Sequence, residues 1–196
     1  MVHGLPQLQC SSLLCEDCVL GKQHRNSFPR ESMWRASQPL QLLHADICGL
    51  ISPISNSHKR NFFTFIDDFS RKLWVFFLTE KLDAFKRFQL FKTKVEKKIG
   101  ISIRGLQTDR GGEFTLSKFF EFCATNGIHH QLTAAYTPQQ NGVARRKNRT
   151  IMNMVRSLLT SRQVPKTFWP AVVNWAVYIL NRSPMLAVQN KTPKEA

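Results

Sequence analysis

Two aspartates lie where a carboxylate can do chemistry. Asp46 sits in the middle of the apolar run 40–50, and Asp109 follows the strand-like run 101–108 just before two glycines. A carboxylate in an apolar strand is costly unless it is paired or binds metal. Either residue alone is more often a turn or capping aspartate. Two acids on strands of one sheet favour a metal pair, because two-metal phosphoryl transfer needs clustered carboxylates around ions about 3.5–4 Å apart.

A pair of cysteines, Cys15 and Cys18, is a second candidate metal motif. A tetrahedral zinc site needs four ligands, and only Cys10, His3 and His24 lie nearby. A redox Cys-x-x-Cys needs a thioredoxin-like context, which the flanking sequence lacks. The pair by itself supplies two of the four ligands that a zinc site needs. The five cysteines are odd in number and irregularly spaced, which argues against a disulfide scaffold and for a reducing compartment.

The chain is strongly basic. Its 196 residues include 28 Lys and Arg against 13 acids, a formal net charge of +15. Such a surplus points to polyanionic partners, with nucleic acid ahead of acidic membrane surfaces. No apolar run is long enough to span a bilayer, and the N-terminal residues lack the basic and apolar regions of a secretory signal. We therefore expect no membrane association and no secretion.

The net positive charge gathers in the last third of the chain, where acids are scarce. Ten basic residues lie between Glu121 and Glu195 without one intervening acid. Solvated helix faces are the alternative interpretation, but they usually mix charges of both signs. We expect nucleic acid to bind Arg145, Arg146, Lys147, Arg149 and Arg156. Helical spacing puts Arg145, Arg149 and Arg156 on one stripe. Beside it, an apolar stripe should be buried, formed by Ala144, Ile151, Val155 and Leu158.

The elements that must position these residues follow from periodicity and breakers. Strands are expected at 40–50, 61–69, 72–79, 101–108 and 129–136. Turn formers between the second and third of these predict an antiparallel hairpin. Helices are expected at 82–99, closed by Gly100, at 116–125, from 142 to before Pro165, and at 168–180. This order predicts an α/β fold with a mixed sheet.

Four motifs carry a family resemblance when they are taken in order. They are Leu43–Gly49 around Asp46, Phe65–Arg71, Thr108–Phe114 around Asp109, and Tyr136–Val143. Together they closely resemble the integrase region of Copia-type LTR retrotransposon Pol polyproteins, of the kind abundant in plants. The resemblance covers nearly the whole chain. It implies an RNase H-like integrase catalytic core, with a mixed five-stranded sheet and flanking helices.

The resemblance also implies a domain plan, partners and cofactors. Residues 1–30 would be the end of a zinc-binding segment, and 38–196 a C-terminally truncated core. Asp46 and Asp109 would hold Mg²⁺ or Mn²⁺ for 3′ processing and strand transfer, while Cys15 and Cys18 would leave a zinc site incomplete. The partners would be DNA, as element ends and target, and further copies of the chain. The location would be the nucleus or a cytoplasmic particle.

One residue departs from the family pattern at a decisive place. The family carries a glutamate at the start of the long helix, where Asn141-Gly-Val-Ala144 is followed here by Arg145. The 35 residues between Asp109 and Arg145 keep the family register. A positive charge about 4 Å from a divalent ion, at an effective dielectric of about 20, is repelled by about 8 kcal/mol. We therefore expect the third metal ligand of the catalytic set to be lost. Arg110, where the family usually has Asn, adds another cation beside the site.

Three functional hypotheses remain open from the sequence. The preferred one is a DNA-binding integrase core with impaired catalysis. The second is an active metal-dependent integrase that uses a substitute acid, although neither Glu113 nor Glu121 lies at the helix start. The third is a non-catalytic remnant kept for protein interaction.

Overall fold

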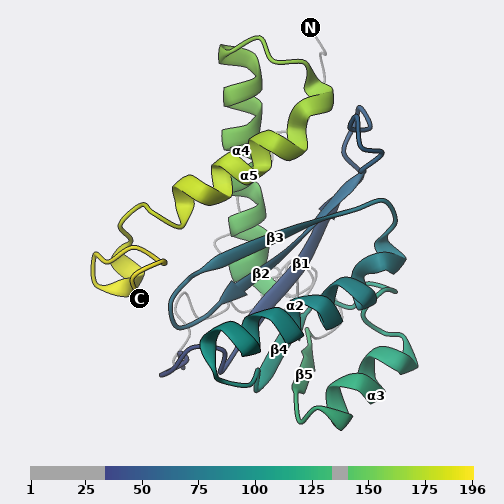
Figure 1. Ribbon diagram of the computed structural model, residues 1–196, viewed down its shortest axis with the longest axis vertical. Helices are drawn as coiled ribbons and strands as arrows, with labels where there is room; N and C mark the ends of the chain where they lie inside the picture. The colour runs from purple at the N-terminus through teal and green to yellow at the C-terminus, as the bar shows by residue number, and fades with distance from the viewer. Residues whose placement is uncertain (1–33, 134–140) are drawn as a thin grey trace, which may run out of the picture. The chain divides into compact units, whose positions relative to one another are not determined.

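The computed structural model describes residues 34–133 and 141–196. Within them, five strands form one sheet in the order β3-β2-β1-β4-β5 (Figure 1). Strands β1 to β3 pair antiparallel, whereas β4 pairs parallel to both β1 and β5. The bounds are β1 Leu43–Gly49, β2 Asn61–Asp67, β3 Leu73–Leu78, β4 Gly105–Thr108 and β5 His129–Leu132. The mixed sheet predicted from the order of elements is therefore confirmed.

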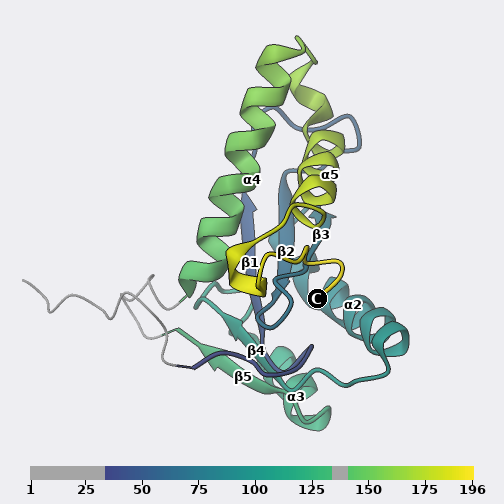
Figure 2. The same ribbon diagram turned by 90° about the vertical axis from the view of Figure 1, so that its left-hand side faces the viewer.

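Helices lie on both faces of this sheet. Figure 2 shows α2 on the side of the sheet away from α4, and in Figure 1 α5 crosses α4. The α-helices are α2 Ala84–Ile99, α3 Ser117–Thr125, α4 Gly142–Ser161 and α5 Trp169–Leu180. Short 3₁₀ turns are η1 Lys81–Asp83, η3 Lys166–Phe168 and η4 Leu186–Val188. No helix in 34–133 or 141–196 is long and apolar enough to cross a membrane.

The sheet separates two hydrophobic cores, and the period of two along each strand decides which core a side chain enters. In β2, Phe63 and Phe65 enter the core under α2 and α3, while Phe62 and Ile66 enter the core under α4 and α5. All seven residues of β2 are buried, because both faces of this strand are covered. The same alternation places His44, Asp46 and Cys48 of β1 on the face that α4 covers.

The predicted strand 101–108 is shorter in the structure, where β4 begins only at Gly105. The reason is a side-chain acceptor from α2. The backbone N–H of Ile103 donates to Glu96 Oε1 at 2.8 Å, so this stretch is tied to the helix before strand pairing starts. The hairpin of β2 and β3 and the helix end at Gly100 are both confirmed.

Gly100 ends α2 in the left-handed region, with φ of 78° and its N–H bonded to Glu96 O. A side chain here would meet no atom within 4 Å, so its cost comes only from the backbone conformation. We expect Gly100→Ala to lower the free energy of unfolding by about 1 kcal/mol. Urea unfolding of both proteins measures the change. Gly112→Ala is the matched control, since it is equally uncrowded and lacks the positive φ; equal losses in the two variants would contradict the explanation.

Candidate active site

The two aspartates lie on adjacent strands at the same level of the sheet. β1 pairs parallel to β4 with Leu43 opposite Leu106 and His44 opposite Gln107. Continuing this register by two residues brings Asp46 level with Asp109, which directly follows β4. The charge of Asp109 raises the pKa of Asp46. The fold thus brings the two carboxylates together.

Asp46 is buried and held by amide donors from α4 and from the residue just before it. Asn148 Nδ2 donates to Asp46 Oδ2 at 2.9 Å, and Asn141 Nδ2 lies 3.5 Å from Oδ1. The hydroxyl of Thr64 donates to Asn148 Oδ1 at 2.9 Å, which fixes that amide. Burial, followed by the charge of Asp109, raises the pKa of Asp46 to about 6, although the bond from Asn148 and the charge of Arg145 lower it.

Asp109 is engaged by the residue that departs from the family pattern. Arg145, in the first turn of α4, places Nη2 3.3 Å from Asp109 Oδ2. The other oxygen, Oδ1, accepts the backbone N–H of Gly111 at 3.0 Å. The side chains of Arg145 and Asp109 are 45% and 27% exposed, so the ion pair is worth at most about 1 kcal/mol. The ion pair matters for its position more than for its energy, because the Arg145 guanidinium occupies the side of Asp109 that faces α4.

The remaining acids do not complete a metal-binding set. Glu113 lies close enough for its charge to raise the pKa of Asp46 slightly, and its Oε1 is 4.0 Å from Lys81 Nζ. Glu121 is exposed on α3. Among the residues of 34–133 and 141–196, no three His, Cys, Asp or Glu side chains form a group that could hold a metal ion.

Two neighbours of the acid pair have structural partners. Arg110 Nε donates to the carbonyl oxygen of Thr133 at 2.8 Å, at the end of β5. His44 Nε2 lies 3.0 Å from Asp68 Oδ1. Burial raises the pKa of Asp68, but bonds from His44 and the Ala36 N–H and the charge of Arg71 outweigh it and hold this pKa below its usual range. The cysteines at 15 and 18 lie outside the described residues.

The buried stripe of α4 differs from the predicted one at a single position. Ala144, Ile151 and Val155 are buried as expected, but Leu158 is only half-buried. The fourth buried position is Asn148, because its amide is needed by Asp46 and Thr64. The signal available in the sequence was the seven-residue spacing of Asn141 and Asn148, which puts two amides on the face that meets the sheet.

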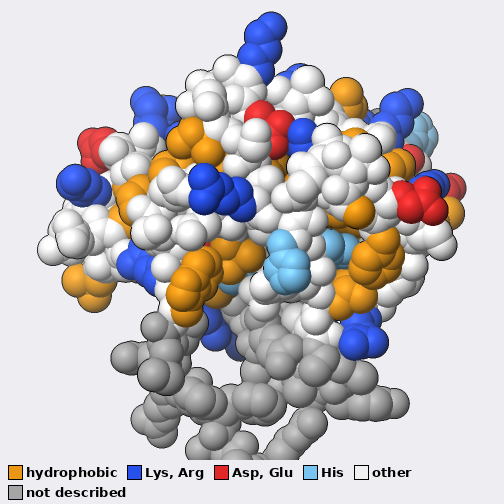
Figure 3. Space-filling model, turned by 90° about the horizontal axis from the view of Figure 1, so that it is seen from below, with side chains coloured by type: hydrophobic (Ala, Val, Ile, Leu, Met, Phe, Trp, Pro, Cys, Tyr) orange, Lys and Arg blue, Asp and Glu red, His pale blue; other side chains and the backbone are white. Residues whose placement is uncertain are grey.

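The basic residues of α4 are mostly at the surface. Arg145, Arg146, Arg149 and Arg156 are exposed, whereas Lys147 is partly buried. Burial and the charge of Arg71 lower the pKa of Lys147. Seen from below, most of the visible Lys and Arg side chains lie apart from one another among neutral and apolar ones (Figure 3). Four exposed arginines therefore lie along one helix that contains no acidic residue.

The motifs and the fold both agree with known proteins. The family model "Integrase core domain" matches residues 36–138. The chain is 44% identical over 180 residues to the retrovirus-related Pol polyprotein from transposon TNT 1-94 of Nicotiana tabacum, covering 92% of this chain and 14% of that protein. It is 35% identical over 194 residues to the Pol polyprotein from transposon RE2 of Arabidopsis thaliana, covering 97% of this chain and 13% of that protein. The chain thus spans about a seventh of these relatives.

Solved structures share the fold at lower identity. A simian T-cell lymphotropic virus intasome in complex with the PP2A regulatory subunit B56 gamma matches with a TM-score of 0.70 and 17% identity, covering 92% of this chain and 62% of that one. The HTLV-2 integrase catalytic core domain in complex with magnesium matches with a TM-score of 0.60 and 20% identity, covering 82% of this chain and 98% of that one. The RNase H-like core expected from the motifs is confirmed, and the chain belongs to the integrase core domain family and is similar in sequence to plant Copia-type retrotransposon Pol polyproteins.

Proposed function

We propose that this core binds DNA as an integrase whose strand-transfer chemistry is impaired by Arg145. The observation that carries the proposal is the ion pair between Arg145 and Asp109 at the start of α4. A metal-dependent integrase needs a carboxylate there, and a cation at that place changes the local charge by two units. The DNA substrates would be the ends of the element and a target duplex.

The donor set supports loss of chemistry. Asp46 and Asp109 are the residues that would hold Mg²⁺ or Mn²⁺ in an intact site, and a structural relative is described in complex with magnesium. Here one carboxylate is capped by Asn148 and the other is paired with Arg145. These groups do not fit a two-metal centre, which needs further oxygen ligands around both ions. We therefore assign them no metal-dependent step.

The surface of α4 supports DNA binding. Arg146, Arg149 and Arg156 are exposed, and neither α4 nor α5 contains an acid that would neutralise them. Lys and Arg side chains that meet phosphates release counterions, and this release drives much of protein–DNA affinity. With DNA as the partner, the location we propose is the nucleus or a cytoplasmic particle that holds the element's DNA.

Self-association is a further part of the proposal. The outer side of α5 exposes Trp175, Tyr178 and Ile179 at 63%, 50% and 39%. Clustered apolar side chains on a surface are typical of protein–protein contact. Structural relatives are described in dimeric and trimeric forms and in an intasome, so a second copy of this chain is the partner we propose for α5.

Strand transfer is the test of the impaired chemistry. The assay joins a processed duplex end to a target duplex with Mg²⁺ or Mn²⁺, and compares the unmodified chain with Arg145→Glu and with Arg145→Glu carrying Asp109→Asn. We expect no product from the first, product from the second, and none from the third. Robust transfer by the unmodified chain would overturn the proposal. Loss of that activity in Glu113→Gln would then identify Glu113 as the substitute acid.

The DNA surface has its own expected result. Changing Arg146, Arg149 and Arg156 together to Gln should weaken duplex binding about tenfold and reduce the slope of log affinity against log salt by about 0.9 for each phosphate that is no longer neutralised. Fluorescence anisotropy over a range of salt concentrations measures both. The matched control changes Lys94, Lys97 and Lys98, which are exposed on α2 at the other face of the sheet. Equal effects of the two triple variants would show that only net charge matters.

A further inference from the structure

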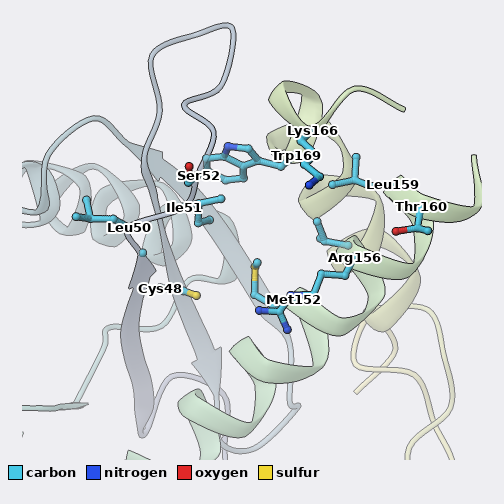
Figure 4. Close-up of a pocket in the computed structure, with 12 residues that line it drawn as sticks. Cys48, Leu50, Ile51, Ser52, Met152, Arg156, Leu159, Thr160, Lys166 and Trp169 are labelled. Atoms are coloured by element: carbon cyan, nitrogen blue, oxygen red, sulfur yellow. The ribbon is translucent and has the colours of Figure 1, made fainter. Parts of the chain in front are cut away.

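A cavity of about 610 Å³ lies farther along α4, beyond the acid pair (Figure 4). Its walls come from the end of β1 and the loop that follows, from the second half of α4, and from the start of α5. Cavities of this size are typical of small-molecule sites. Ile51, Met152 and Leu159 give it an apolar lining.

Two cations line this cavity without a counterion. Arg156 and Lys166 are both exposed, and no carboxylate in the described chain lies within 4.0 Å of either. Figure 4 shows the Arg156 side chain extending beside Met152 on the side of Cys48. Burial and the charge of Asp46 raise the pKa of the Cys48 thiol to about 11, although the charge of Arg156 lowers it. The cavity therefore combines an apolar lining with unneutralised positive charge.

A buried donor adds a third feature. Trp169 lines the cavity, is 2% exposed, and has an indole Nε1–H without a hydrogen-bond partner among the described residues. Packing against Phe77 and Phe62, at ring-centroid distances of 5.7 and 6.4 Å, holds the indole in place. Trp169 is therefore a rigid part of the cavity wall, and its buried indole N–H gives a signal that reports on binding beside it.

We propose that this cavity binds a small aromatic anion, with its acidic group at Arg156 and its rings on Ile51, Met152 and Leu159. Lys166 adds positive charge from the other side of the cavity (Figure 4). Charge sets the preference for an anion, because neither Arg156 nor Lys166 has a carboxylate partner in the described chain; Arg156 Nη1 donates to the neutral amide oxygen of Asn153 at 3.4 Å. The apolar lining sets the preference for flat rings over a hydrophilic anion such as free phosphate. The site is separate from the acid pair and needs no metal.

The experiment uses 2-naphthoate as the probe and follows the four tryptophan indole N–H signals by ¹⁵N NMR. Trp169→Phe assigns the Trp169 signal. We expect 2-naphthoate to shift that signal in a saturable way at millimolar concentrations or below, and to leave Trp74 unchanged. The neutral analogue 2-naphthamide should bind about tenfold more weakly, a loss of about 1.4 kcal/mol.

Paired variants separate this site from general charge attraction. Arg156→Gln with Lys166→Gln should weaken naphthoate binding by at least about tenfold. Arg162→Gln with Lys191→Gln removes two exposed cations that do not line the cavity. This double variant should change the affinity for naphthoate less than twofold. Thr160→Trp, which fills the cavity from its rim, should abolish the shift. Equal binding of the amide, equal effects of the two double variants, or no saturable shift of Trp169 would each overturn the proposal.

Discussion

Replacing Arg145 by Glu is expected to make the stability of this core depend on divalent metal. The change removes the ion pair with Asp109 and puts a third carboxylate beside two that already interact. In the presence of a chelator, the free energy of unfolding should fall by about 2 kcal/mol. At most about 1 kcal/mol comes from the lost ion pair, and the rest comes from repulsion among the carboxylates. Saturating Mg²⁺ or Mn²⁺, at about a hundred times its dissociation constant, should return about 2.7 kcal/mol.

Urea unfolding with and without metal measures this difference. Arg149→Glu is the matched control, because it makes the same charge change one turn along α4 at an exposed residue that has no ion pair in the described chain. It should show no metal dependence. The explanation fails if metal leaves Arg145→Glu unaffected, or if metal stabilises the unmodified chain to the same extent.

The second large effect is a loss of stability as the pH rises from 4 to 6, caused by Asp46. Its pKa is about 6 in the folded chain against an ordinary value of 3.8. Between these values the folded protein keeps a proton that the unfolded chain has lost, so the free energy of unfolding falls as pH rises and levels off above about 6. Two pKa units correspond to about 3 kcal/mol.

Asp46→Asn should remove this dependence and keep the acceptor for Asn148. The expected result is that the variant gains stability relative to the unmodified chain from pH 4 to pH 6, by up to about 3 kcal/mol. Urea unfolding at each pH, in metal-free buffer, measures the difference. Glu121→Gln, at an exposed acid of α3, is the control. A constant difference between Asp46→Asn and the unmodified chain across the range would contradict the assignment.

Much of the fold was predictable because its signals are local. The turn at Asp67 and Asp68 predicts the hairpin of β2 and β3, and Gly100 predicts the end of α2. The limits of β4 were not predictable. They depend on Glu96, a side chain from α2 that captures the Ile103 N–H, and no periodicity within 101–108 reports that contact.

In the candidate site, too, some features were predictable from local signals and others depended on distant contacts. The register of Asp46 and Asp109 follows from parallel pairing of their strands. The roles of Asn141 and Asn148 were missed, because an amide looks like an ordinary helix residue until its partner across the sheet is known. Arg145 was predicted to repel metal and to lie on a basic stripe. Its guanidinium meets Asp109, and that pairing depends on the distance between a strand end and a helix start that lie far apart in sequence.

Titration of the unmodified chain with Mn²⁺, followed by electron paramagnetic resonance, tests the central claim most directly. The claim is that Arg145 occupies the position of the third ligand through its pairing with Asp109. It predicts no stoichiometric Mn²⁺ binding by the unmodified chain, and binding that appears in Arg145→Glu and is lost again when Asp109→Asn is added. A spin-coupled pair of Mn²⁺ ions on the unmodified chain, abolished by Asp46→Asn or Asp109→Asn, would contradict it.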